Sequence, residues 1–132
     1  MVLTLIYKIK GPDKIILVTD SMRAAGMPEG EYYLGSSEKG QKVIVEDNVA
    51  KMPDRKAFAG SVATTDLLVR VLYKDVKVPI EEAVKMITIN PAKLMNIDNR
   101  KGSLIPGKEA DVLVFDENIQ IDRIIVAGNI IK

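Results

Sequence analysis

The chain of 132 residues contains no cysteine, no tryptophan and no histidine. The absence of cysteine excludes disulfides, thiolate zinc sites and cysteine nucleophiles, and it is compatible with a reducing cytoplasm. The absence of histidine excludes a Ser-His-Asp triad, a histidine general base and every imidazole metal ligand within this chain. Any catalysis by these residues alone must therefore use aspartate, glutamate, lysine, serine, threonine or tyrosine.

A strong net charge is also missing, because 19 Lys and Arg residues balance 18 Asp and Glu residues. This balance gives no reason to expect nucleic acid or a membrane surface as a partner. No apolar run approaches the roughly 18 residues of a membrane span, and Lys8 and Lys10 follow the first apolar residues, the reverse of a secretory signal. We therefore expect a cytoplasmic protein, too short for a (β/α)₈ barrel, which needs at least about 200 residues.

The first twenty residues predict a helix, a tight turn and a buried strand. An apolar helix face is indicated by the i, i+3, i+4, i+7 spacing of Val2, Leu5, Ile6 and Ile9. Gly11 and Pro12 end this helix. The run Lys14–Asp20 is aliphatic without alternation, which is typical of a strand buried on both faces of a parallel sheet. Asp20 then stands at the carboxyl end of that strand, where α/β enzymes place their sites.

The rest of the chain predicts a hairpin, a group of helices and a second group of strands. The hairpin falls between Glu31 and Lys51 and turns at Asp47 and Asn48. Helices are expected to begin near Thr64 or Thr65, at Pro79 as the first helical residue, and at Asn90 as the N-cap of a turn that reaches Leu94. The strands are Val112–Phe115 and a terminal hairpin from Ile121 to Ile131, which turns at Gly128 and Asn129.

Two segments are candidates for chemistry from residue type and position. Asp20 suits a general acid/base or a metal ligand, and equally a helix N-cap or a partner for an arginine. The turn Ala59-Gly60-Ser61 either faces a substrate or only needs a glycine for its backbone geometry, and the residues alone favour the geometric explanation. Two further patterns indicate no site. Lys8, Lys10 and Lys14 fit a solvated surface better than an anion site, and Gly35-x₄-Gly40 lacks the ending of a phosphate loop.

Five longer segments of the sequence carry a recognisable pattern: Leu17–Met22, Ala24–Tyr32, Phe58–Ser61, Asn90–Ala92 and Lys101–Val112. Together they resemble the N-acetylglucosamine-6-phosphate deacetylases, a family of the amidohydrolase superfamily. The block from Thr19 to Tyr32 is the most specific, whereas the stretch Gly102–Phe115 resembles many amidohydrolases. The resemblance begins near Tyr7 and covers nearly the whole remaining chain.

The resemblance implies a fold and a division of roles. It implies an α/β fold: the C-terminal piece of a metal-dependent (β/α)₈ barrel, meaning the last strand and the helices that follow it, plus strands of a small β-sandwich. Asp20 matches the aspartate that takes a proton from the metal-activated water and then gives a proton to the leaving amine. Phe58, Ala59 and Gly60 match the loop that closes over the bound sugar. The expected domains are residues 1–101, with a hairpin excursion at about 31–56, and residues 102–132.

The resemblance also implies what this chain cannot supply. The family's metal ligands, a glutamate and histidines, lie on earlier barrel strands, so zinc or a similar divalent metal is expected in the intact enzyme and none on this chain alone. We expect a piece that hydrolyses N-acetylglucosamine 6-phosphate only within the intact enzyme and is inactive alone. The expected partners are the amino-sugar phosphate and either the missing N-terminal part or another copy, with the run Ile15–Val18 buried between copies. The alternatives are another amidohydrolase, of cyclic amide or deaminase type, and a non-catalytic self-associating module.

Overall fold

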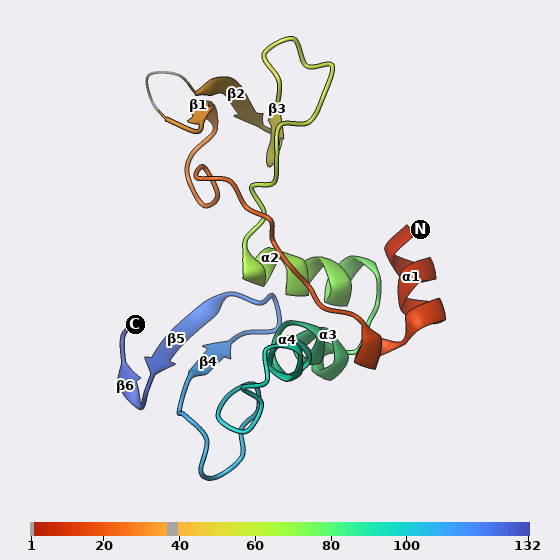
Figure 1. Cartoon of the computed structure of the whole chain (residues 1–132), viewed down its shortest axis with the longest axis vertical. Coiled ribbons are helices and arrows are strands. Elements are labelled where there is room, and N and C mark those ends of the chain that lie inside the picture. Colours follow the sequence, from red (N-terminus) through yellow and green to blue (C-terminus); the bar gives the residue numbers. More distant parts are fainter. Residues whose placement is uncertain (1, 37–39) are drawn as a thin grey trace. The chain divides into compact units, whose positions relative to one another are not determined.

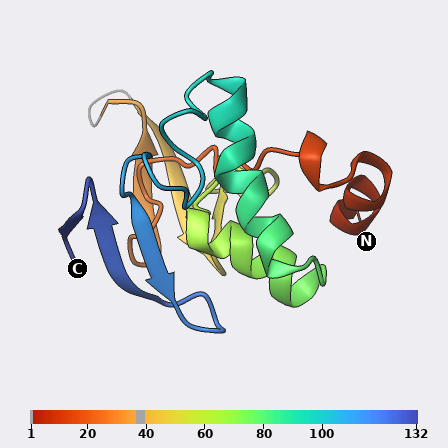
Figure 2. The same cartoon turned by 90° about the horizontal axis from the view of Figure 1, so that it is seen from below.

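The structure is a computed structural model that describes residues 2–36 and 40–132 and contains two compact units. Unit 1 combines the N-terminal residues up to Leu17 with Asp66–Lys132, and unit 2 is Val18–Thr65. Figures 1 and 2 show a helical group with one small sheet in unit 1 and a second small sheet in unit 2. The chain is therefore a mixed α/β structure. These two units are defined within this chain alone. The expected domain boundary between residues 101 and 102 refers to the intact barrel enzyme, so it stays a prediction.

Unit 1 is built on short helices that surround one apolar core. These are α1 (Val2–Lys10), a 3₁₀ turn (Pro12–Lys14), α2 (Thr65–Arg70) with a π-helical turn (Val71–Asp75), α3 (Ile80–Ile87) and α4 (Ile89–Leu94). The fully buried part of the core comprises Val69, Leu72, Val78, Ala83, Met86 and Ile119. Helix α3 supplies Ala83 and Met86 because its apolar residues recur at helical spacing, and Glu81 and Glu82 favour its N-terminal end.

The sheet of unit 1 is antiparallel, in the order β4 (Val112–Phe115), β5 (Ile121–Val126) and β6 (Asn129–Ile130). The expected strand and terminal hairpin are thus confirmed. The turn lies one residue earlier than expected, at Ala127 and Gly128, which both have positive φ values of 48° and 82°. Two consecutive positive φ angles are what a two-residue hairpin turn requires, and glycine meets this requirement at the second position.

Unit 2 contains the expected hairpin, extended to three antiparallel strands: β1 (Gly30–Leu34), β2 (Gln41–Glu46) and β3 (Val49–Lys51). Asp47 and Asn48 form the β2–β3 turn with φ values of 53° and 58°, as their residue types predict. Strand β2 buries every second side chain, Val43 and Val45, in a core that it shares with Ala24, Ala50 and Ala59. This core sits beneath the segments that carry the candidate site residues.

The prediction of a buried strand over Lys14–Asp20 is wrong. Lys14 ends the 3₁₀ turn, and residues 15–20 form no strand. Ile15 and Leu17 pack against the core of unit 1, whereas Val18 is 73% exposed. A strand buried on both faces needs a hydrogen-bonded neighbour on each side, and the described residues provide no neighbouring strand here. Of the segment's apolar residues, Val18 is thus the most exposed, and the expected self-association through Ile15–Val18 stays a prediction.

The helix starts agree with the sequence to within one or two residues, but the roles predicted for Pro79 and Asn90 are wrong. Helix α2 begins at Thr65 as expected, and Pro79 is the N-cap of α3 instead of its first residue. Asn90 lies inside α4, whose N-cap is Thr88. Its buried side-chain amide donates hydrogen bonds to the carbonyl oxygens of Pro12 and Ile15, both at 2.7 Å. Among the helices formed by the described residues, none has the length and apolar character needed to cross a membrane.

Candidate functional site

Asp20 and the Phe58–Ser61 loop meet within unit 2. Ser21 and Ser61 form a parallel β-bridge, and the Met22 N–H donates to the Ser61 carbonyl oxygen at 2.8 Å. The Ser21 hydroxyl also donates to the Ala63 carbonyl oxygen. Asp20 and Gly60 each directly precede one of the two bridged serines. The parallel bridge therefore brings two segments that are forty residues apart in the sequence next to each other.

The Asp20 side chain is available for chemistry. It is exposed, and within the part of the chain that the structure describes it has no hydrogen-bond or ion-pair partner. Neither of the structural alternatives, a helix cap or an arginine partner, is formed there. Its φ of 48° lies in the left-handed region, which costs about 1 kcal/mol for a residue with a Cβ and is tolerated best by Asn and Asp. Such backbone outliers concentrate at functional sites, so the conformation supports a functional hypothesis for this residue.

Gly60 has a clear geometric reason to be glycine. Its φ is 106°, a value that residues with a side chain rarely adopt. Space is not the constraint, because an added Cβ would lie 3.7 Å from the Met22 Cβ, an ordinary contact. The geometric explanation is thus supported, and contact between Gly60 and a substrate stays a prediction.

Phe58 and Ala59 face different environments. The Ala59 N–H donates to the Ala50 carbonyl oxygen at 2.8 Å, and its side chain is buried in the core of unit 2. Ala59 can therefore offer a ligand only its backbone. The Phe58 side chain is 79% exposed, although its backbone forms an antiparallel bridge with Lys51. An exposed aromatic ring on a fixed backbone is suited to cover the apolar face of a sugar ring.

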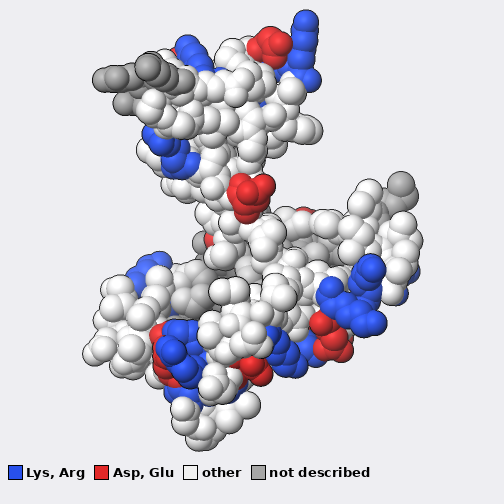
Figure 3. Space-filling view, in the orientation of Figure 1, with Lys and Arg blue, Asp and Glu red and all other residues white. Residues whose placement is uncertain are grey.

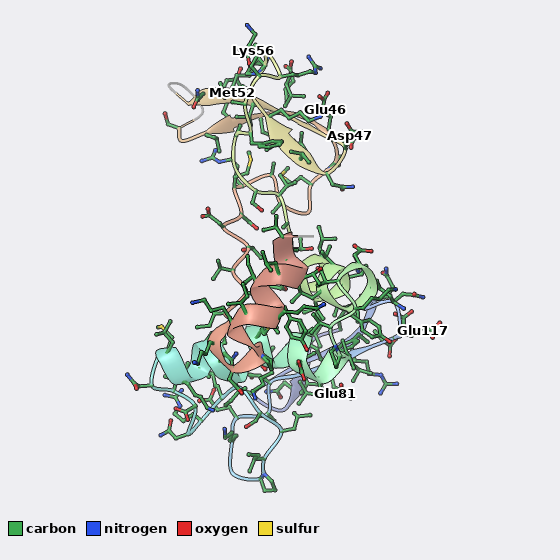
Figure 4. All side chains as sticks on the ribbon, turned by 90° about the vertical axis from the view of Figure 1, so that its right-hand side faces the viewer. Glu46, Asp47, Met52, Lys56, Glu81 and Glu117 are labelled. Carbon is green, nitrogen blue, oxygen red and sulfur yellow. The ribbon has the colours of Figure 1, made fainter. Side chains whose placement is uncertain are left out.

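A polar cluster beside this loop was not predicted from the sequence. The Arg55 guanidinium binds both carboxylate oxygens of Glu46, at 2.9 and 3.1 Å, and the Lys51 ammonium contacts Glu46 at 3.1 Å and Asp47 at 3.3 Å. Arg55, followed by Lys51, holds the pKa of Glu46 below its ordinary value. Figure 4 shows Glu46 and Asp47 close together at the β2–β3 turn. The pairing depends on the β2–β3 register, so no local sequence signal could have found it.

The same cations line a shallow depression of about 200 Å³ together with Lys56, Ala57 and Phe58. Lys51 and Arg55 are already neutralised by the carboxylates described above. Lys56 contributes only its backbone N–H to a hydrogen bond, with the Asp54 carboxylate at 3.0 Å. Among the described residues, the Lys56 ammonium is therefore the one cation of the depression without a carboxylate partner, and a single exposed lysine does not make an anion site.

The residues present do not fit a resident divalent metal. The chain has no histidine or cysteine. Within residues 2–36 and 40–132, no group of three or more aspartate and glutamate side chains is placed to hold an ion. A single exposed carboxylate such as Asp20 falls short of the several ligands that a zinc or magnesium site uses. We therefore derive no chemical step through a metal bound to this chain.

The remaining sequence candidates lie elsewhere. Lys8, Lys10 and Lys14 are exposed residues of unit 1, as expected for a solvated surface. In the Gly35-x₄-Gly40 pattern, residues 37–39 lie outside the described part of the chain. The site that the structure assembles is thus Asp20 with the Phe58–Gly60 loop.

Comparison with known proteins matches this chain to sugar-phosphate deacetylases. It is 42% identical over 124 residues to the N-acetylglucosamine-6-phosphate deacetylase of Lysinibacillus sphaericus, which covers 94% of this chain and 30% of that protein. It is 34% identical over 118 residues to a protein of Escherichia coli K12 described as a putative N-acetylgalactosamine-6-phosphate deacetylase, covering 89% of this chain and 68% of that one. The chain thus spans about a third of the length of the Lysinibacillus enzyme and most of the Escherichia coli protein.

Solved structures give the same result for the fold. The N-acetylglucosamine-6-phosphate deacetylase of Pasteurella multocida superimposes with a TM-score of 0.86 and 27% identity over 97% of this chain and 32% of that chain. A variant of the Mycobacterium smegmatis enzyme, in complex with N-acetyl-D-glucosamine-6-phosphate, gives a TM-score of 0.84 and 28% identity over 98% and 33%. The sequence profile of the Amidohydrolase family matches residues 12–131. The chain therefore belongs to the amidohydrolase family, whose members are in general metal-dependent hydrolases.

Proposed function

We propose that this chain is the C-terminal part of an N-acetylglucosamine-6-phosphate deacetylase, which hydrolyses N-acetylglucosamine 6-phosphate to glucosamine 6-phosphate and acetate. The observation that carries the proposal is the Ser21–Ser61 bridge, which brings Asp20, a side chain without a partner among the described residues, next to the Phe58–Gly60 loop. The 42% identity to the Lysinibacillus deacetylase supports it. The Escherichia coli relative favours N-acetylgalactosamine 6-phosphate as a second candidate substrate.

Asp20 would carry the proton in this reaction. Amide hydrolysis needs a group that takes a proton from the attacking water and returns one to the leaving amine nitrogen, and one carboxylate can do both in sequence. The exposed Asp20 side chain has no competing partner among the described residues, so its oxygens are open to both steps. Phe58 would cover the sugar and Gly60 would let the backbone approach it.

The other groups of the reaction would come from outside these residues. The resident metal of the family, zinc or a similar ion, would be held by the rest of the enzyme because this chain lacks the ligands. We therefore expect the purified chain to release no acetate from either sugar phosphate, even with zinc or manganese added. Turnover by the chain alone that is lost in Asp20→Asn would refute this expectation.

A chimera tests the positive side of the proposal. The 124 matched residues of the Lysinibacillus enzyme are replaced by the corresponding residues of this chain, and acetate release is measured with both sugar phosphates. The proposal predicts turnover, faster with N-acetylglucosamine 6-phosphate. A folded, metal-loaded chimera that hydrolyses neither substrate would contradict it, and a preference for the galactosamine compound would favour the second candidate.

A further inference from the structure

Two serine hydroxyls beside the candidate site both bind the backbone of Ala63. The Ser21 hydroxyl donates to the Ala63 carbonyl oxygen, and the Ala63 N–H donates to the Ser61 hydroxyl oxygen at 3.1 Å. We name Ser21, Ser61 and Ala63 the serine clasp. In Figure 3 the surface over the segments that carry these residues is mainly white, that is, uncharged. The two segments are thus joined here by hydrogen bonds between neutral groups.

The clasp gives the segment after Asp20 a second point of attachment. The first is the backbone, because Ser21 bridges with Ser61 and the Met22 N–H donates to the Ser61 carbonyl oxygen at 2.8 Å. The second is the Ser21 side chain, which reaches the carbonyl group two residues further along the partner segment. Ser61 prepares this contact, because its hydroxyl takes the Ala63 N–H in a local turn. Two attachments at different positions fix the direction of a segment more closely than either does alone.

The residue that the clasp holds in place is Asp20. Asp20 directly precedes Ser21, and its φ of 48° is a conformation that a residue with a Cβ adopts only at an energetic cost. Such a conformation persists when the surrounding structure holds it. In the part of the chain that the structure describes, the Asp20 side chain has no partner of its own. The direction of its carboxylate is therefore set through its backbone.

We propose that Ser21 is a positioning residue for Asp20, and that its hydroxyl, through Ala63, holds the carboxylate in the direction that proton transfer needs. This assignment rests on the proposed function for the reaction itself. Proton transfer depends steeply on distance and direction, so a loosened carboxylate slows the chemical step more than it weakens substrate binding. Ser21 is an anchor and not a nucleophile here, because its hydroxyl proton is donated to the Ala63 carbonyl oxygen.

A pair of isosteric substitutions tests the hydroxyl. Ser21→Thr keeps the hydroxyl, whereas Ser21→Val carries a methyl group in its place, so the effect of the added bulk is common to both variants. Both are made in the chimera described above, and kcat and KM are measured with N-acetylglucosamine 6-phosphate. We expect Ser21→Val to lower kcat about tenfold with KM changed less than about twofold, and Ser21→Thr to keep kcat within about twofold of the parent chimera. Equal kcat values in the two variants, or a rise in KM in place of the fall in kcat, would overturn the proposal.

The Asp20→Asn background separates positioning from a general loss of structure. If Ser21 acts through the Asp20 carboxylate, Ser21→Val should lower kcat of the Asp20→Asn chimera by no more than about twofold, because the group that Ser21 positions is already gone. A merely structural role would lower kcat to the same extent in both backgrounds. An equal loss in the two backgrounds would therefore refute the assignment.

A measurement on the full chain alone covers the case of a chimera without turnover. Nuclear magnetic resonance follows the contact between the amide and Hα protons of residue 20, which is strong when φ is positive, together with hydrogen exchange of the Met22 N–H. Ser21→Thr should preserve both signals, whereas Ser21→Val should weaken the contact and speed the exchange about fivefold, the effect of one lost hydrogen bond. Unchanged signals in Ser21→Val would contradict the role of the clasp.

The two measurements also keep the positioning and the proposed function apart. A chain whose signals respond to Ser21→Val, in a folded chimera that hydrolyses neither sugar phosphate, would support the clasp and count against the proposed function alone. A chimera that turns over equally fast with Ser21→Val would support the proposed function and count against the positioning alone.

Discussion

The side chain of Asn90 gives the sharpest test of how unit 1 holds the segment that leads to Asp20. Asn90 is 7% exposed and donates two hydrogen bonds of 2.7 Å to the carbonyl oxygens of Pro12 and Ile15. The Leu17 N–H, two residues further on, donates to the Met86 carbonyl oxygen at 3.0 Å. These bonds fix the same short segment to α3 and α4.

Replacing Asn90 by aspartate distinguishes two possible roles of this side chain, that of a hydrogen-bond donor and that of a helix N-cap. Aspartate caps helix N-termini as well as asparagine does, so Asn90→Asp would be nearly neutral if the side chain were an N-cap. In this structure the substitution removes both donors and sets a carboxylate against two carbonyl oxygens. Each buried hydrogen bond contributes about 1 kcal/mol, and an unsatisfied buried partner costs about 1–3 kcal/mol. We therefore expect a loss of at least about 2–3 kcal/mol in the free energy of unfolding.

The assay is urea unfolding at neutral pH followed by circular dichroism, with amide exchange of Leu17 as a local probe. The exposed Asn99 provides the control, and Asn99→Asp should change stability by no more than about 0.5 kcal/mol. Exchange at the Leu17 amide should become faster in Asn90→Asp than in Asn99→Asp. If Asn90→Asp were as stable as the parent chain, the role assigned to this amide would be wrong.

Two further predictions concern unit 1. Gly102 has a φ of 87°, and an added Cβ would lie 2.9 Å from the Ile89 Cα, whereas the equivalent position at Gly107, with a φ of 94°, is open. Gly102→Ala should thus cost about 2–4 kcal/mol of unfolding free energy in urea titrations and Gly107→Ala about 1–2; equal losses would refute the clash. The second prediction concerns Glu109 and Asp111, whose pKa values are both lowered chiefly by hydrogen bonds from the Lys101 ammonium. Arg100 adds to the effect at Glu109, and the Ala127 N–H adds to it at Asp111. A lowered pKa in the folded state gives stability above the unfolded pKa of about 4, and this stability is lost as pH falls through the folded value. The melting temperatures of the parent and Lys101→Met should therefore converge in acid, and a constant difference down to the acid transition would contradict this.

Local sequence signals predicted the elements that depend on local chemistry. Asp47 and Asn48 take the positive φ values of their turn, and the terminal strands form where the β-branched runs lie. The same signals failed at Lys14–Asp20. An apolar run predicts a strand only when neighbours exist to pair with it, and here the described residues supply helices in their place. The run therefore packs only Ile15 and Leu17 against the core of unit 1 and leaves Val18 exposed, because neither the burial nor the hydrogen-bond partner of an apolar run is determined by its own residues.

The identity of the candidate site residues could be predicted from the sequence, but their arrangement in space could not. Asp20 was selected from its position after an apolar run and from the family resemblance, although the run is no strand. The left-handed backbone of Asp20 and the Ser21–Ser61 bridge depend on contacts forty residues apart, which no periodicity reports. The Glu46–Arg55 pair was missed for the same reason. Its members become neighbours through the pairing of β2 with β3 together with the turn after β3, in which the Arg55 N–H donates to the Met52 carbonyl oxygen.

The central claim, that Asp20 moves the proton in a deacetylase reaction, is tested most directly by turnover of the chimera with Asp20→Asn. The matched control is Asp54→Asn, an exposed carboxylate of the same unit whose replacement keeps the oxygen that accepts the Lys56 N–H. Our account predicts a loss of about 100-fold or more in kcat for Asp20→Asn, the usual contribution of a positioned proton-transfer group, and no change for Asp54→Asn. Undiminished turnover in a folded Asp20→Asn chimera would contradict it.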